Sequence, residues 1–148
     1  MEDKRITKTK RALKSALLEL LTTQAFDAIS ITELCKIANV SRITFYTHYK
    51  DKFALLDDIF NDMLIIGKEG YHRRQEENNP ENNLTQGYLN VLDCILSLYY
   101  ERYDFFQHVV PETNPYLAFR FYRILLDTVE SHTDKLKASY SLKYSARQ

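Results

Sequence analysis

Glycine and proline are scarce in this chain, with three of each among 148 residues. Turn-rich β folds need both residues repeatedly, so the scarcity argues against that class. Leucine, lysine, glutamate and alanine are plentiful, and all four favour helices. Hydrophobic residues make up 45% and charged residues 27%, a balance that supports a packed core and not a disordered chain. The composition therefore predicts an all-α fold, as one domain or two small helical lobes.

Cysteine is also rare, and the two thiols, Cys35 and Cys94, lie in apolar helical patterns without a CxxC spacing. This argues against both a disulfide framework and a zinc site, and it predicts two small buried side chains. The first ten residues are charged and lack the apolar stretch of a signal peptide. No apolar run approaches the roughly 18 residues of a membrane span. We therefore expect a cytoplasmic protein with no membrane association.

Catalytic motifs are missing as well. The sequence contains no HExxH, GxSxG, P-loop or GxGxxG pattern, and its four histidines lie far apart. His108 and Glu112 could form an acid–base pair, but a packed or ligand-contacting histidine is the better interpretation. A metal site formed by residues that are distant in the sequence remains an alternative. We expect neither an enzyme nor a bound cofactor or metal.

Charge is unevenly spread although the net charge is zero. Residues 1–52 carry ten Lys or Arg against six Asp or Glu, and residues 53–148 carry ten against fourteen. A basic front half and an acidic rear half predict a polyanion partner for the front half alone. Chance asymmetry between solvated surfaces is the alternative interpretation.

The most informative stretch covers residues 30–52. Ser30 to Glu33 fits a capping box, in which the serine and glutamate side chains accept hydrogen bonds from backbone amides at a helix start. The predicted buried face of this helix comprises Leu34, Ile37 and Ala38. Asn39 follows, and asparagine tolerates the left-handed conformation that ends a helix. The pattern predicts a first helix that starts after Ser30 and stops at Asn39.

A second helix is predicted over residues 42–49. Ser41 is a suitable N-cap, and Phe45 and Tyr49 are spaced to face the core. Asp51 is a suitable cap for the next helix. Together the two short helices and their tight turn have the form of a helix-turn-helix.

Apolar residues at helical spacing predict the remaining elements. They are helices over 7–23, 52–73 and 84–103, a short helix over 105–110 capped by Asp104, and a helix that starts at Asn114-Pro115. The first has an apolar stripe of Leu13, Ala16, Leu17, Leu20 and Leu21. The last is apolar almost all round over 116–126 and should be buried. Residues 75–83, QEENNPENN, predict a loop, and residues 139–148 show no clear pattern.

The helix over 42–49 carries the functional argument. Its surroundings offer hydroxyls, cations and an imidazole on Ser41, Arg42, Thr44, Tyr46, Thr47, His48 and Lys52. Such groups read base edges in the major groove and bind phosphates, and threonine methyl groups can touch thymine. Ser41 and the amides at the helix start could also hold a phosphate. The alternative is an ordinary amphipathic helix with a polar outer face.

Residues 8–65 resemble the N-terminal DNA-binding domain of the TetR/AcrR family of bacterial transcription regulators. In that family an Ile-Ala pair and a Gly-Val turn precede Ser-x-x-Thr-hydrophobic-Tyr-x-His/Tyr-Phe-x-x-Lys-x-x-Leu. This sequence has Leu34-Cys35 at the pair, Asn39-Val40 at the turn, and then Ser41, Thr44, Phe45, Tyr46, His48, Tyr49, Lys52 and Leu55. Ile43 stands where the family often has glycine, and we expect its bulk to alter the base contacts.

The resemblance implies DNA contacts at Ser41, Arg42, Thr44, Tyr46, His48 and Lys52, with backbone contacts at Thr7, Lys8 and Thr32. It also implies a rear lobe that binds a small effector and forms the dimer. A pocket for a small apolar or aromatic ligand could be lined by Tyr88, Tyr99, Tyr103, Phe106, His108, Phe119 and Tyr122. Plain core is the alternative for these side chains.

Family members usually continue with two further helices that build the dimer interface. This chain stops at Gln148, about where those helices would begin, so we expect a naturally short or truncated protein. Pairing would then use another apolar surface in the rear lobe. We expect a DNA-binding domain over 1–52, a connecting helix over 52–73, and an effector-binding and dimerisation domain over 53–148.

The sequence thus predicts a TetR-like regulator, a repressor relieved by a small effector. Its homodimer would read a palindromic site in double-stranded operator DNA, with the helix over 42–49 in the major groove. The first alternative is a truncated helical partner protein that pairs with a full-length relative and does not itself read DNA. The second, an enzyme on a helical scaffold, is disfavoured by the missing motifs.

Overall fold

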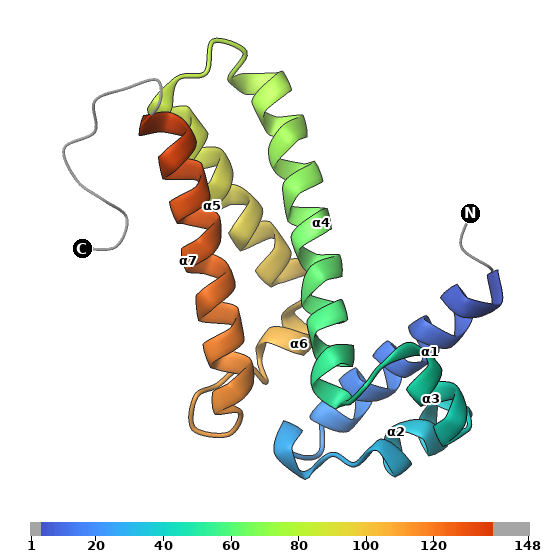
Figure 1. The fold of residues 1–148 in the computed structure, drawn as a ribbon. Helices are drawn as coiled ribbons and strands as arrows, with labels where there is room; N and C mark the ends of the chain where they lie inside the picture. Colours follow the sequence, from blue (N-terminus) through green and yellow to red (C-terminus); the bar gives the residue numbers. More distant parts are fainter. Residues whose placement is uncertain (1–3, 138–148) are drawn as a thin grey trace. The chain divides into compact units, whose positions relative to one another are not determined.

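The computed structural model of the chain describes residues 4–137, and side chains as far as Asp134 (Figure 1). The regular structure in this range is helical throughout, which confirms the all-α prediction. Its elements are α1 (Lys4–Leu21), the 3-10 turn η1 (Phe26–Ala28), α2 (Ile31–Ala38), α3 (Arg42–His48), α4 (Lys52–Asn78), α5 (Leu84–Glu101), α6 (Tyr103–Phe106) and α7 (Pro115–Lys137). The expectation for residues 139–148 lies outside the described residues.

The chain divides into two compact units, and the boundary lies inside α4, between Leu64 and Ile65. The N-terminal unit contains α1, η1, α2, α3 and the first half of α4. The C-terminal unit contains the second half of α4 with α5, α6 and α7. The continuous helix α4 therefore belongs to both units.

The core of the N-terminal unit is built on the predicted stripe of α1. All five of its residues are buried: Leu13, Ala16, Leu17, Leu20 and Leu21. Phe26, Phe45 and five residues of α4 are among the other buried side chains of this core, and each large one contributes about 1.5–3 kcal/mol. On α2 the prediction for Ile37 is wrong, because that side chain is 39% exposed and Cys35 is buried in its place. A turn of about 100° per residue puts Ile37 on the flank of the Leu34–Cys35 face.

The C-terminal unit packs three long helices against one another, the second half of α4 with α5 and α7 (Figure 1). Side-chain hydrogen bonds join each pair. Arg74 Nη2 donates to Ser97 Oγ (3.0 Å), Tyr88 Oη lies 3.0 Å from Thr133 Oγ1, and Tyr71 Oη lies 3.4 Å from His132 Nδ1. These contacts fix the register of the three helices.

The predicted loop over 75–83 is partly wrong, because α4 continues to Asn78. The reason is an amide network that sequence patterns do not show. Asn90 is 1% exposed and its Nδ2 donates to Gln75 Oε1 (2.6 Å) and Asn78 Oδ1 (2.8 Å). Its Oδ1 accepts from Asn78 Nδ2 and Gln86 Nε2, both at 3.1 Å. Because these amides satisfy one another, the polar end of α4 stays helical against α5.

Other element limits also differ from the predictions. α1 starts at Lys4, α5 ends at Glu101, and Asp104 lies inside α6 without capping it. α7 starts at Pro115 as predicted. The expected burial of α7 is wrong for Phe119 and Tyr122, which are 59% and 57% exposed. The neighbouring helices α4 and α5 cover only part of the surface of α7, so an all-round apolar sequence leaves these rings on its outer face.

Candidate nucleic-acid interface

The start of α2 carries the predicted capping box. Ser30 Oγ accepts a hydrogen bond from the Glu33 amide (3.2 Å), and Glu33 Oε2 accepts from the Ser30 amide (2.9 Å) and hydroxyl (2.6 Å). The hydrogen bonds from the Ser30 hydroxyl and amide, joined by one from Gln24, hold the pKa of the Glu33 carboxyl below its usual value. The capping box therefore keeps Glu33 ionised at the positive end of the helix.

The turn between α2 and α3 has the predicted chemistry. Asn39 adopts the left-handed conformation, with φ 54° and ψ 47°. Its amide donates to Lys36 O (3.3 Å), and the Val40 amide donates to Cys35 O (3.0 Å), which closes α2. Ser41 is the N-cap of α3 and its Oγ accepts from the Thr44 amide (3.0 Å). The chain thus passes from α2 to α3 within three residues, as a helix-turn-helix requires.

One face of α3 lies in solvent. Arg42, Ile43, Tyr46 and Thr47 are exposed, whereas Phe45 on the opposite side is fully buried. Ile43 is 80% exposed and Tyr46 is 49% exposed. Ile43 is not among the predicted contacts, although its bulk was expected to alter the contacts that α3 makes with the bases. Its position in the sequence, between the predicted contacts Arg42 and Thr44, could have indicated that it also lies near the bases.

The hydroxyl groups on α3 already have partners in the free chain. Ser41 Oγ lies 2.8 Å from Thr44 Oγ1, and Thr47 Oγ1 donates to Thr44 O at 2.7 Å. Thr44 and His48 are half-buried. Arg42 and Tyr46 therefore offer exposed polar groups to DNA directly, while the serine and threonine hydroxyls must exchange partners to reach it.

The other predicted contacts lie outside α3. Thr7 and Lys8 are exposed in the first turns of α1, and Thr32 is exposed at the second residue of α2. Lys52 is different, because it is half-buried and its ammonium donates to three backbone carbonyls.

The predicted effector residues do not gather in one place. Tyr99 stacks on Phe106 (5.6 Å between ring centroids) and contacts Tyr103 (6.0 Å). Tyr88 lies eleven residues before Tyr99, about 16 Å away along the helix, and contacts His132 of α7. Phe119 and Tyr122 lie on the exposed side of α7, and His108 is half-buried beyond α6. The structure thus brings together three of the seven side chains.

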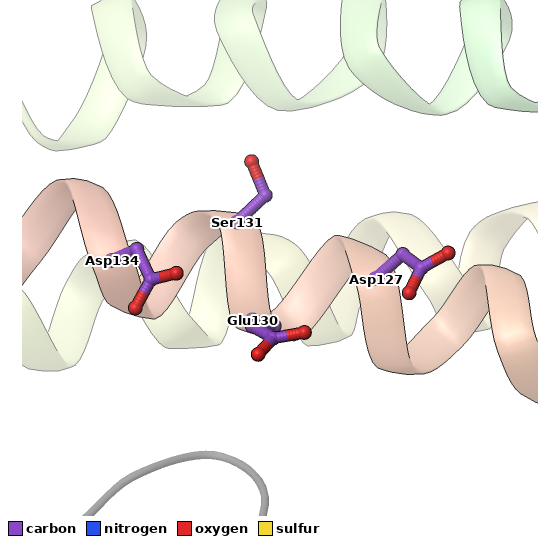
Figure 2. Close-up of a pocket in the computed structure, with 4 residues that line it drawn as sticks. All are labelled: Asp127, Glu130, Ser131 and Asp134. Atoms are coloured by element: carbon purple, nitrogen blue, oxygen red, sulfur yellow. The ribbon is translucent and has the colours of Figure 1, made fainter.

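A pocket of about 510 Å³ runs along α7, lined by Asp127, Glu130, Ser131 and Asp134 (Figure 2). Its lining is acidic and includes none of the predicted effector residues. Among the described side chains, no three His, Cys, Asp or Glu residues are grouped so as to hold a metal ion. None of the helices within residues 4–137 has the length and apolar character needed to cross a bilayer.

Comparisons with known proteins agree with this geometry. Residues 13–59 match the family described as bacterial regulatory proteins, tetR family. A stretch of 58 residues is 40% identical to the uncharacterized HTH-type transcriptional regulator YxbF of Bacillus subtilis (strain 168). That stretch covers 39% of this chain and 14% of the relative, so the chain matches about a seventh of the relative's length. The residues matched to the family, 13–59, run from the second half of α1 to the first two turns of α4.

Proposed function

We propose that this chain, which belongs through residues 13–59 to the tetR family of bacterial regulatory proteins, is a DNA-binding transcriptional regulator. The observation that carries the proposal is the α2–turn–α3 unit, with its capped helices, its left-handed Asn39 and its exposed α3 face. A helix-turn-helix is built to lay its second helix in the major groove. Such a regulator works where the chromosome lies, in the cytoplasm.

On DNA, each exposed group of α3 has a suitable partner. The Arg42 guanidinium can bind a guanine edge or a phosphate, and the Tyr46 hydroxyl can bind a phosphate or a base edge. Ile43 can pack against the methyl group of thymine, which the major groove presents beside the base edge. Lys8 and the hydroxyls of Thr7 and Thr32 are suited to the phosphate backbone. Specificity would then come from Arg42, Ile43 and Tyr46, and orientation from the others.

We propose further that two copies bind a palindromic operator, with their α3 helices about 34 Å apart along the duplex. The exposed apolar side chains of the C-terminal unit support pairing through that unit. They include Leu89, Leu92, Leu96 and Tyr99, which recur every three or four residues on α5 and would form a seam for another helix.

Repression relieved by a small ligand is the proposed mode of control. The cluster of Tyr99, Tyr103 and Phe106 supports a ligand with an apolar or aromatic body, since such rings bind one another edge-on or stacked. α4 belongs to both units, so a ligand that favours one position of α4 would change how the α3 helices are held.

Selection from a library of random duplexes tests the proposal. We expect the wild-type chain to recover a palindromic motif, and light scattering to find two chains on each recovered duplex. If the recovered duplexes share no sequence motif, the proposal is contradicted. A stable monomer that binds a half-site would contradict the proposed dimer and leave the proposed DNA binding intact.

A further inference from the structure

Lys52, the first residue of α4, lies at the centre of a set of contacts inside the N-terminal unit. Its Nζ donates hydrogen bonds to Phe26 O (2.9 Å), Asp27 O (2.8 Å) and Ile29 O (2.8 Å). All three acceptors belong to η1 or to the residue directly after it. We name this arrangement the carbonyl clamp.

The clamp matches the chemistry of a lysine side chain. An ammonium group has three N–H donors arranged as a tripod, and each one here has a carbonyl partner. The same ammonium lies 5.0 Å from the centroid of the Phe26 ring and 5.9 Å from that of Phe53, so two aromatic rings add cation–π attraction. With all three donors engaged, a phosphate contact would require the clamp to open.

The clamp also acts on the position of α2. Ile29 directly precedes Ser30, the N-cap of α2, so a bond to Ile29 O fixes the start of that helix. Phe26 is buried, and its ring packs edge-on against Phe53 at 5.3 Å. On the other side of Lys52, the Asp51 carboxylate caps α4 by accepting from the Ala54 amide (2.8 Å). Lys52 therefore ties the α1–α2 connection to the first turn of α4.

We propose that Lys52 is a positioning residue, which sets the placement of α2 and α3 for DNA binding and makes no phosphate contact of its own. The inference rests on the proposed function for its effect on DNA. The clamp itself is a property of the folded chain, and its effect on stability can be measured without DNA.

The test compares two substitutions. Lys52→Met keeps the aliphatic stem and removes the charge, and Lys52→Arg keeps the charge and replaces the tripod by a planar fork. Lys50→Met, at an exposed lysine two residues earlier, is the matched control for loss of one charge. The probe is a fluorescent duplex recovered by the wild-type chain from the random library, titrated at several salt concentrations.

If Lys52 positions α2 and α3, both Lys52 variants unfold at least about 5 °C below wild type, and Lys50→Met does not. At a temperature where they are folded, both bind the duplex about tenfold more weakly, as one misplaced base contact would cause. The slope of log Kd against log salt stays at the wild-type value, because no phosphate contact is lost.

A phosphate contact predicts another pattern. Lys52→Met would then melt with the wild type and lose about one unit of salt slope, and Lys52→Arg would restore it. That pattern, or wild-type affinity in folded Lys52→Met, would overturn the proposal. If Lys52→Met does not fold, the affinity and melting temperature of Lys52→Arg distinguish the two roles. A guanidinium can replace an ammonium at a phosphate, but its planar fork cannot bond three converging carbonyls.

If the wild-type chain recovers no duplex, the proposed function is contradicted, but the proposed role of the carbonyl clamp in stability is not. The melting temperatures then still test the clamp, and an unchanged value for both Lys52 variants contradicts it.

Discussion

Tyr49 donates a hydrogen bond from its hydroxyl to Asp58 Oδ2, 2.6 Å away, and so ties the end of α3 to the second turn of α4. The same carboxylate lies 3.2 Å from the Lys14 ammonium of α1, which also bonds Asp62 at 2.6 Å. Three helices of the N-terminal unit therefore meet at one carboxylate. This contact and the carbonyl clamp hold the two ends of the helix-turn-helix on α4.

Removing the Tyr49 hydroxyl tests this contact. We expect Tyr49→Phe to lower the free energy of unfolding by about 1–2 kcal/mol, because the bond is to a charged, partly buried acceptor. Urea titration followed by circular dichroism measures the change. Tyr46→Phe, which removes a more exposed hydroxyl from the same helix, is the matched control and should stay within about 0.5 kcal/mol of wild type. Equal losses of unfolding free energy in the two variants would show that the Tyr49–Asp58 hydrogen bond does not stabilise the fold.

Asp58 should also make stability depend on pH. Burial alone would raise the pKa of its carboxyl, but the hydrogen bonds from Tyr49 and Lys14 and the charges of Lys14 and Lys10 outweigh burial and lower it. A carboxyl whose pKa is lowered by folding stabilises the folded state above its unfolded value of about 3.9. That contribution is lost as the pH falls through the folded-state pKa.

We therefore expect the difference in unfolding free energy between wild type and Asp58→Asn to be largest near pH 6 and to shrink below about pH 4. Thermal melts over this range give the comparison. A difference that stays constant down to pH 2.5 would contradict the assigned pKa shift.

Ile43 is expected to read a thymine. In the duplex recovered by selection, replacing thymine by uracil removes only the methyl group that Ile43 would contact. At one position in each half-site we expect this change to weaken wild-type binding several-fold and to leave Ile43→Ala unaffected, since the partner is already gone. Ile65→Ala, at another exposed isoleucine, should respond to uracil as the wild type does. The idea fails if uracil costs Ile43→Ala as much as it costs wild type at every position.

The amide network of the C-terminal unit gives a further prediction. Asn90→Ala removes a buried amide together with its four hydrogen bonds to Gln75, Asn78 and Gln86, so we expect a loss of about 2–3 kcal/mol in unfolding free energy. Asn82→Gly is the control, because Asn82 is exposed with φ 56° and glycine keeps that conformation at little cost. Denaturant titration of the two variants makes the comparison. An Asn90→Ala chain as stable as Asn82→Gly would mean that the network does not hold the end of α4.

Features that depend on neighbours in the sequence were predictable. The Ser30–Glu33 capping box, the left-handed Asn39 and the Ser41 cap each involve groups within four residues, and the structure contains all three. The apolar stripe of α1 was also predictable, since the helical period decides which residues share a face. Much of the helix-turn-helix could thus be derived before its structure was known.

Features that depend on distant partners were not predictable. The carbonyls around Lys52 lie 23 to 26 residues before it, and the sequence shows a cation without showing its acceptors. Likewise, Gln75 and Asn90 are 15 residues apart, so the sequence alone did not show that the start of the predicted loop over 75–83 forms the last turn of α4. The 80% exposure of Ile43 was not predictable either, because it depends on how α3 packs, which only the fold decides.

The central claim is that the exposed face of α3 binds DNA. The most direct measurement is the fluorescence anisotropy of the selected duplex titrated with wild type, Tyr46→Ala and the control Tyr100→Ala, which removes an exposed tyrosine of α5. We predict that Tyr46→Ala binds at least about tenfold more weakly than wild type and discriminates less against a scrambled duplex, while Tyr100→Ala matches wild type. Equal affinities for Tyr46→Ala and wild type, together with equal binding of selected and scrambled duplexes, would contradict the account.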